Sequence, residues 1–173
     1  EEDVLDRFYQ AAKPYNPDFV VRLTSDCPLI DPSLIDMIID DTIISNVDYC
    51  SNTLIESYPD GQDVEVFSFK SLRNAWEESV LRSDREHVTP YMKRNFKVLN
   101  VHSNNMKFNK VRMTVDEPSD FVVIKRLVDK LGLNEKWETY ANLYLNNKTI
   151  SNINDSITRN EGYTKSIKND LHN

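Results

Sequence analysis

Hydrophobic residues follow a helical period at the start of the chain and then form a short apolar run. They recur at intervals of three and four residues, at Val4, Leu5, Phe8, Ala11, Ala12 and Tyr15. This pattern predicts a helix over 4–15, which Pro14 and Pro17 end. The apolar segment 19–24 that follows predicts a buried strand.

Helix-like and strand-like patterns of hydrophobic residues alternate along the rest of the chain. Asp31 can cap a helix whose first position is Pro32. Further helices are predicted over 71–81, 84–95, 118–131 and 134–147, and strands over 48–52, 64–69, 97–102 and 110–115. Residues 58–61 have the Pro and Gly placement of a tight turn. Because 48–69 leaves no room for a crossover helix, we expect a layered α/β domain with a mixed sheet.

Composition narrows the classes of function. The 173 residues are 39% hydrophobic, enough for one domain with a core. The net charge of −7 argues against a nucleic-acid partner, since binding a phosphate backbone needs a basic surface. Without an apolar stretch long enough to span a bilayer and without a signal peptide, we expect no membrane insertion and a cytoplasmic location. Cys27 and Cys50 have no metal-binding spacing, which argues against a zinc site.

Two acidic motifs follow strand-like runs ninety residues apart, SDCPLID and VDEPSD. In α/β domains ligands bind outside the carboxyl ends of strands, so Asp26 and Asp116 are candidates to hold a cation against a phosphate. The alternatives are structural. Asp26 could cap a turn, and Asp116 and Asp120 could satisfy free N–H groups at a helix start.

Five segments carry a family resemblance: SDCPLIDPSLID, YPDGQDVEVFSF, REHVTPY, VRMTVDEPSDF and RNEGY. Their order resembles that in cytidylyltransferases of the spore coat polysaccharide biosynthesis protein F type, relatives of CMP-sialic acid and CMP-Kdo synthetases. The resemblance implies a three-layer nucleotidyltransferase domain, similar to the glycosyltransferase-A fold. Residues 1–149 would be its C-terminal two-thirds and 150–173 a polar C-terminal arm.

Family members hold the nucleotide triphosphate with an N-terminal loop of the form QARMGSTRLPGK. Nothing in this sequence matches that loop, and the chain begins without Met. We therefore expect an N-terminally truncated domain, assign no residue to nucleotide binding, and expect the chain alone to be inactive.

The resemblance implies transfer of CMP from CTP to an acidic sugar, sialic- or Kdo-like, with release of pyrophosphate, for surface polysaccharide. It assigns Asp26 and Asp116 as catalytic ligands of Mg²⁺ and points to Asp63, Arg85 and His87 as substrate-binding residues. A homodimer is expected, with segment 58–69 reaching the neighbouring subunit.

Other interpretations stay open. Asp63 and Glu65 alternate with apolar residues and could lie on a solvated sheet face, and Arg85 with Glu86 could be a surface pair. Arg22, inside an apolar strand, is expected to pair with a structural carboxylate. The rival functions are a nucleotide-sugar glycosyltransferase and a non-catalytic domain that only dimerises.

Overall fold

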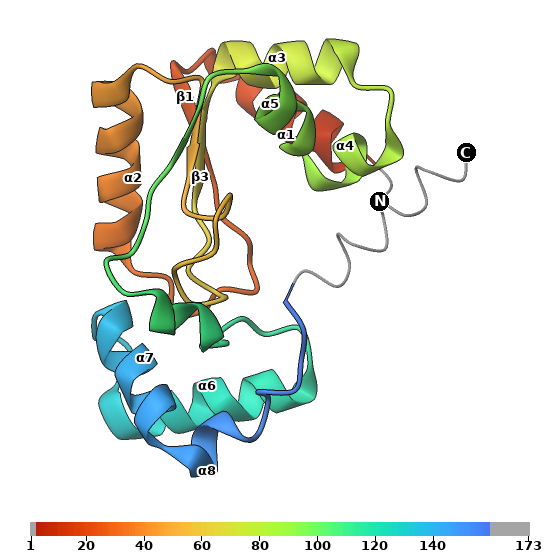
Figure 1. Cartoon of the computed structure of the whole chain (residues 1–173). Coiled ribbons are helices and arrows are strands. Elements are labelled where there is room, and N and C mark those ends of the chain that lie inside the picture. The colour runs from red at the N-terminus through yellow and green to blue at the C-terminus, as the bar shows by residue number, and fades with distance from the viewer. Residues whose placement is uncertain (1–2, 160–173) are drawn as a thin grey trace.

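A four-stranded mixed sheet separates two groups of helices in the computed structural model, which describes residues 3–159 (Figure 1). The strands are β1 (Phe19–Arg22), β2 (Tyr49–Ser51), β3 (Glu65–Ser68) and β4 (Val98–Asn100), in the order β1-β3-β2-β4. β3 is antiparallel to both β1 and β2, and β4 is parallel to β2. The expected α/β class with a mixed sheet is confirmed.

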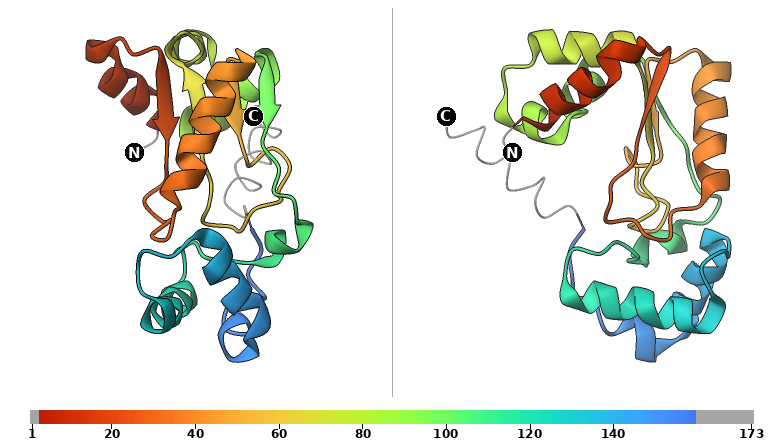
Figure 2. Two further views of the ribbon diagram at one scale, coloured as in Figure 1. Left: turned by 90° about the vertical axis from the view of Figure 1, so that its left-hand side faces the viewer. Right: turned by 180° about the vertical axis from the view of Figure 1, so that it is seen from behind.

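Helices cover both faces of this sheet (Figures 1 and 2). One face carries α2 (Pro32–Ser45). The other carries α1 (Val4–Ala12), the 3₁₀ turn η1 (Lys13–Tyr15), α3 (Phe69–Glu78), α4 (Arg82–His87) and α5 (Pro90–Asn95). Beyond one end of the sheet lie η2 (Met106–Lys110), α6 (Pro118–Leu131), α7 (Trp137–Asn146) and α8 (Lys148–Ser151). None of the described helices has the length and apolar character needed to cross a membrane.

The alternation of side chains along the strands builds two cores. Cys50 and Val66 pack with α2, α6 and α7, whereas their neighbours Tyr49 and Phe67 pack with α1, α3 and α5. Successive residues of a strand point to opposite faces, so a three-residue strand such as β2 contributes to both cores. The sheet is therefore buried on both sides.

Several predicted boundaries agree with the structure. Asp31 caps α2, and its carboxylate accepts a hydrogen bond from the Ser33 N–H at 2.8 Å. The prediction of one continuous helix over 84–95 is wrong, because this segment is divided between α4 and α5. Val88 between them has a φ of 73°, and Pro90 removes a backbone donor.

One predicted strand also differs from expectation. Residues 110–115 add no strand to the sheet and pair only through a bridge between Asp60 and Arg112. Within segment 58–69, β3 is hydrogen-bonded on both edges inside the sheet. Of the arm predicted over 150–173, the structure describes residues 150–159, and Ile150 and Asn154 are buried there.

The predicted turn at 58–61 joins this bridge to the sheet. Gly61 has a φ of 96°, and a Cβ on it would lie 2.5 Å from the Met113 carbonyl carbon. Its close approach lets Asp60 exchange backbone hydrogen bonds with Val111 and Met113 at 2.9 and 2.7 Å. Only glycine satisfies both the backbone conformation and the contact.

We predict that Gly61→Ala lowers the free energy of unfolding by about 2–5 kcal/mol, from left-handed strain plus a backbone clash. Gly132→Ala is the matched control, since Gly132 also has positive φ (82°) but a Cβ added to it would meet nothing within 4 Å. That control should lose only about 1–2 kcal/mol. Urea unfolding of both variants measures the difference, and equal losses would contradict the clash.

Candidate active site

An open cleft of about 590 Å³ lies at the end of the sheet where β1 stops and β3 begins. Of the side chains predicted to form the site, Asp26, Asp63, His87 and Asp116 line this cleft. Arg85 is not among its lining residues. Segments far apart in the sequence thus meet here, as the two acidic motifs suggested.

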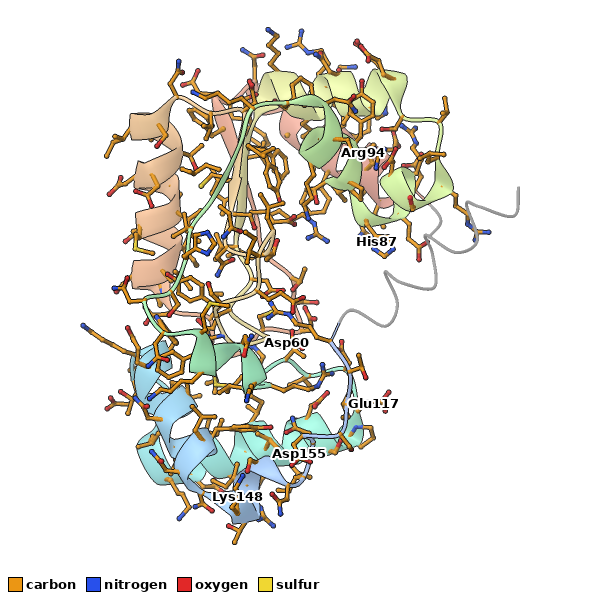
Figure 3. All side chains as sticks on the ribbon, in the orientation of Figure 1. Asp60, His87, Arg94, Glu117, Lys148 and Asp155 are labelled. Atoms are coloured by element: carbon orange, nitrogen blue, oxygen red, sulfur yellow. The ribbon has the colours of Figure 1, made fainter. Side chains whose placement is uncertain are left out.

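Charge is unevenly distributed along the cleft. Six carboxylates line it, and five of them lie at one end together with Arg112: Asp26, Asp60, Asp63, Asp116 and Glu117. The part of the wall next to α4 and α5 carries the sixth carboxylate, Glu65, together with the bases Arg22, His87 and Lys93. Figure 3 shows His87 near α4, with Asp60 and Glu117 on the opposite side of the cleft. The cleft therefore has an acidic end and a basic end.

Asp26 is tied to the second acidic motif by two adjacent residues. The Val115 N–H donates to the Asp26 carbonyl at 2.8 Å, and the Thr114 hydroxyl donates to Asp26 Oδ2 at 2.9 Å. These bonds fix the loop after β1 against segment 111–116. The two motifs are thereby held in register although ninety residues separate them.

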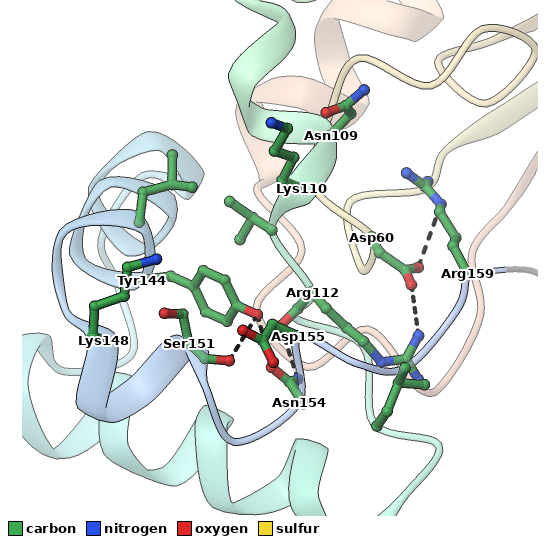
Figure 4. Close-up of a pocket in the computed structure, with 13 residues that line it drawn as sticks. Asp60, Asn109, Lys110, Arg112, Tyr144, Lys148, Ser151, Asn154, Asp155 and Arg159 are labelled. Atoms are coloured by element: carbon green, nitrogen blue, oxygen red, sulfur yellow. Dashed lines mark hydrogen bonds and ion pairs between the residues drawn. The ribbon is translucent and has the colours of Figure 1, made fainter.

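Arg112 lies at the centre of the acidic end and is only 7% exposed. Its Nη1 donates to Asp60 at 2.7 Å and its Nη2 to Asp116 at 2.9 Å. Nε and Nη2 bind the two oxygens of Asp120 at 2.9 and 2.8 Å, a bidentate pair. Asp60 and Arg112 also line a second cavity of about 430 Å³, together with Arg159 (Figure 4).

Asp120 serves the fold. Its side chain is fully buried and accepts further bonds from the N–H groups of Asp116 and Glu117 and from Asn154. Burial alone would raise the pKa of Asp120, but the bonds from Arg112, Asn154 and the backbone outweigh it and lower that pKa to about 2. Asp120 therefore stays ionised although its side chain is shielded from solvent.

Asp63 is held by an arginine from the C-terminal part of the chain. Arg159 Nη2 donates to Asp63 Oδ1 at 2.6 Å, and its Nη1 donates to the Tyr58 carbonyl at 3.2 Å. Burial raises the pKa of Asp63 to about 7 and repulsion from Asp60 adds to the shift, while Arg159 opposes it. Asp63 is thus poised to exchange a proton near neutral pH.

Glu65 organises the basic end and is buried, so the solvated sheet face considered for it is wrong. It pairs with Arg22 at 2.5 Å and Lys93 at 3.1 Å, and it accepts hydrogen bonds from Tyr49 and Thr89. Burial opposes its ionisation, but Lys93 and then Arg22 outweigh burial and lower the pKa of Glu65 to about 2. The expectation that Arg22 pairs with a structural carboxylate is confirmed.

A strained turn shapes this wall of the cleft. The Thr89 N–H donates to the His87 carbonyl at 2.8 Å around Val88, whose φ is 73°. This three-residue turn is rare for a β-branched residue and costs about 1–3 kcal/mol. It places His87 and Thr89 together on the wall of the cleft.

Arg85 stands apart from the cleft. It donates to the carboxylate of Asp3 at 3.0 Å and to the carbonyl of Trp76 at 2.7 Å, so it links the start of α1 to α3. These contacts are those of a residue that joins helices. Its predicted role in substrate binding gains no support from its position.

The donor chemistry of the acidic end fits Mg²⁺. Among the described residues no group of three or more His, Cys, Asp or Glu side chains is arranged to hold a metal. Mg²⁺, however, is usually held by one or two carboxylates while substrate oxygens and waters complete its shell. Asp26 and Asp116 supply two such carboxylates, each with Oδ2 held by a neighbour.

Sequence reasoning missed five residues that contact the carboxylates of the cleft or their partners: Asp60, Lys93, Arg112, Thr114 and Arg159. Segment 111–116 carried a usable signal, because its apolar and polar residues alternate strictly. Arg159 opens the RNEGY segment of the family resemblance, which could have marked it. Lys93 carried no signal, since it reaches the site only through the tertiary fold.

A family model described as Cytidylyltransferase matches residues 1–156. Over 162 residues the chain is 36% identical to an uncharacterised protein of Methanocaldococcus jannaschii, covering 91% of this chain and 65% of that protein. It is 31% identical over 137 residues to spore coat polysaccharide biosynthesis protein SpsF of Bacillus subtilis, covering 76% of this chain and 56% of SpsF. The chain thus spans less than two thirds of the length of either relative.

The fold is also similar to a solved structure. A cytidylyltransferase from Leptospira borgpetersenii superposes with a TM-score of 0.80 at 28% identity, covering 91% of this chain and 67% of that one.

We predict that Asp63 makes stability depend on pH. Because its folded pKa of about 7 lies above its ordinary value of 3.8, its contribution is complete below pH 3.8 and is lost as pH rises to about 7. Asp63→Asn should show a smaller fall in the free energy of unfolding between these pH values. Urea unfolding of both proteins across pH 4–8 measures this, and parallel curves would count against the raised pKa.

Proposed function

Since the chain belongs to the cytidylyltransferase family, we propose that it takes part in transferring CMP from CTP to a hydroxyl group of an acidic sugar. Pyrophosphate is the second product. The name of the SpsF relative supports surface polysaccharide as the destination. Because the relatives are longer than this chain, the complete transfer reaction is a proposal for the protein as a whole.

One observation carries the proposal. Asp26 and Asp116 come from distant motifs, yet they line the same cleft and are joined through segment 114–116. A nucleotide-bound Mg²⁺ is usually held by one or two carboxylates, and Asp26 and Asp116 supply two beside this cleft.

In this proposal Asp26 and Asp116 hold Mg²⁺. When bound, the cation neutralises charge that develops on the phosphate oxygens and on the leaving pyrophosphate. Arg112 keeps Asp116 oriented through its 2.9 Å bond. Asp63, with its raised pKa, is suited to accept the proton of the attacking hydroxyl.

The basic end supports an acidic acceptor. Arg22 and Lys93 share the single carboxylate of Glu65, which leaves one positive charge in excess beside the cleft. An excess cation beside a half-open cleft favours an anionic group of the substrate. Lys93 replaces Arg85 in our assignment of the sugar-binding residues, and His87 is retained.

Two expectations complete the proposal. We expect a homodimer, and sedimentation at the mass of one chain would contradict it. No residue of the sequence is assigned to grip the triphosphate, so we expect the 173-residue chain alone to show no turnover.

The test of function is product analysis in the longest form that the gene encodes. With CTP and Mg²⁺ we expect pyrophosphate and a CMP conjugate from sugar acids such as sialic or Kdo-type acids, and none from the matching neutral sugars. A nucleotide-sugar glycosyltransferase would release no pyrophosphate. The absence of any product would favour the alternative that the protein is a non-catalytic domain that only dimerises.

We further predict that Asp26→Asn or Asp116→Asn lowers the rate of pyrophosphate release at least about 100-fold, because a metal ligand contributes several kcal/mol to charge stabilisation. Asp36→Asn is the control, since Asp36 is a carboxylate on α2 that does not line the cleft. Initial rates over a range of Mg²⁺ concentrations measure the effect. Unchanged rates in both cleft variants would rule out the metal assignment.

A further inference from the structure

We propose that Thr114 is a positioning residue that orients the Asp26 carboxylate for a divalent cation. The proposal rests on the metal role proposed above for Asp26 and Asp116. It adds a residue that is neither charged nor a metal ligand itself.

Side chains of segment 111–116 point alternately to the core and to the cleft, and Thr114 lies on the cleft side. Val111 and Met113 are buried in the core beneath α2, α6 and α7. Arg112, Thr114 and Asp116 line the cleft. In extended backbone successive side chains point to opposite sides, so one short segment serves the core and the site at once.

The contacts of Thr114 single out one oxygen of Asp26. Its hydroxyl lies 2.9 Å from Asp26 Oδ2 and 3.3 Å from the Asp26 carbonyl oxygen. A hydroxyl has one hydrogen to donate, and the shorter, charge-assisted bond to the carboxylate is the stronger. Thr114 is 2% exposed, which shields this bond from competing water.

This bond leaves the second oxygen of Asp26 available. Within the described part of the chain, Oδ1 has only a long contact with the Cys27 thiol at 3.8 Å. Arg112 repeats the arrangement on Asp116, where Nη2 holds Oδ2 at 2.9 Å. Donors two residues apart on one segment therefore fix one oxygen of each carboxylate.

Hydrogen bonds to metal-binding carboxylates fix their orientation, and their loss costs about 10–100-fold in metal affinity. Arg112 also carries the fold, through Asp60 and Asp120. Thr114 is the better probe, since valine has nearly its shape and suits extended backbone.

The experiment is a titration of the chain with Mn²⁺ alone, read by the electron paramagnetic resonance signal of the free ion. Thr114→Val should raise the dissociation constant about tenfold or more, whereas Thr114→Ser should stay close to the unsubstituted chain. Thr42→Val is the matched control, because it removes a buried hydroxyl that donates to the Ile38 carbonyl away from the cleft. Circular dichroism confirms that each variant is folded.

Equal Mn²⁺ affinity in Thr114→Val and the unsubstituted chain would overturn the role of Thr114 and leave the metal assignment standing. Equal weakening by valine and serine would also overturn it, since packing rather than the hydroxyl would then be responsible. Failure of the unsubstituted chain to bind Mn²⁺ would overturn this inference together with the metal role of Asp26 and Asp116.

Discussion

The bidentate pair between Arg112 and Asp120 is the interaction on which the lower half of the molecule depends. Both side chains are almost without solvent, and breaking a buried ion pair by removing one partner typically costs about 3–5 kcal/mol. The pair joins segment 111–116 to the first turn of α6, and Asn154 extends it toward α8. The same guanidinium reaches Asp60 and Asp116, so the network that closes the core also sets one wall of the cleft.

Two buried charge clusters line the cleft, one around Arg112 and one around Glu65. Around Arg112 carboxylates outnumber the arginine, whereas around Glu65 two bases share one carboxylate. A buried charge persists only when paired, so each cluster is stable by itself while its excess faces the cleft. Such opposed ends suit a substrate pair in which a metal-bound phosphate meets an anionic acceptor, as proposed for this member of the cytidylyltransferase family.

Local patterns predicted the helices and strands whose periodicity is unbroken, such as α2 with its Asp31 cap and α6 between Pro118 and Gly132. They failed at the break between α4 and α5, where the positive φ of Val88 ends the helix. A positive φ in a β-branched residue leaves no sequence signature. For the site, motif position brought Asp26 and Asp116 to the same cleft. The partners of Arg85 and Glu65 could not be foreseen, since Asp3, Lys93 and Thr89 meet them only after the chain has folded.

The alternation of segment 111–116 has a consequence for how this family can diverge. Any substitution that respects polarity leaves its two faces intact, but a deletion or insertion of one residue would exchange them and turn Met113 toward the cleft. Length between Val111 and Asp116 is therefore constrained in addition to the identities of Arg112, Thr114 and Asp116. Relatives that keep the same site should therefore keep the spacing of the polar positions in this segment.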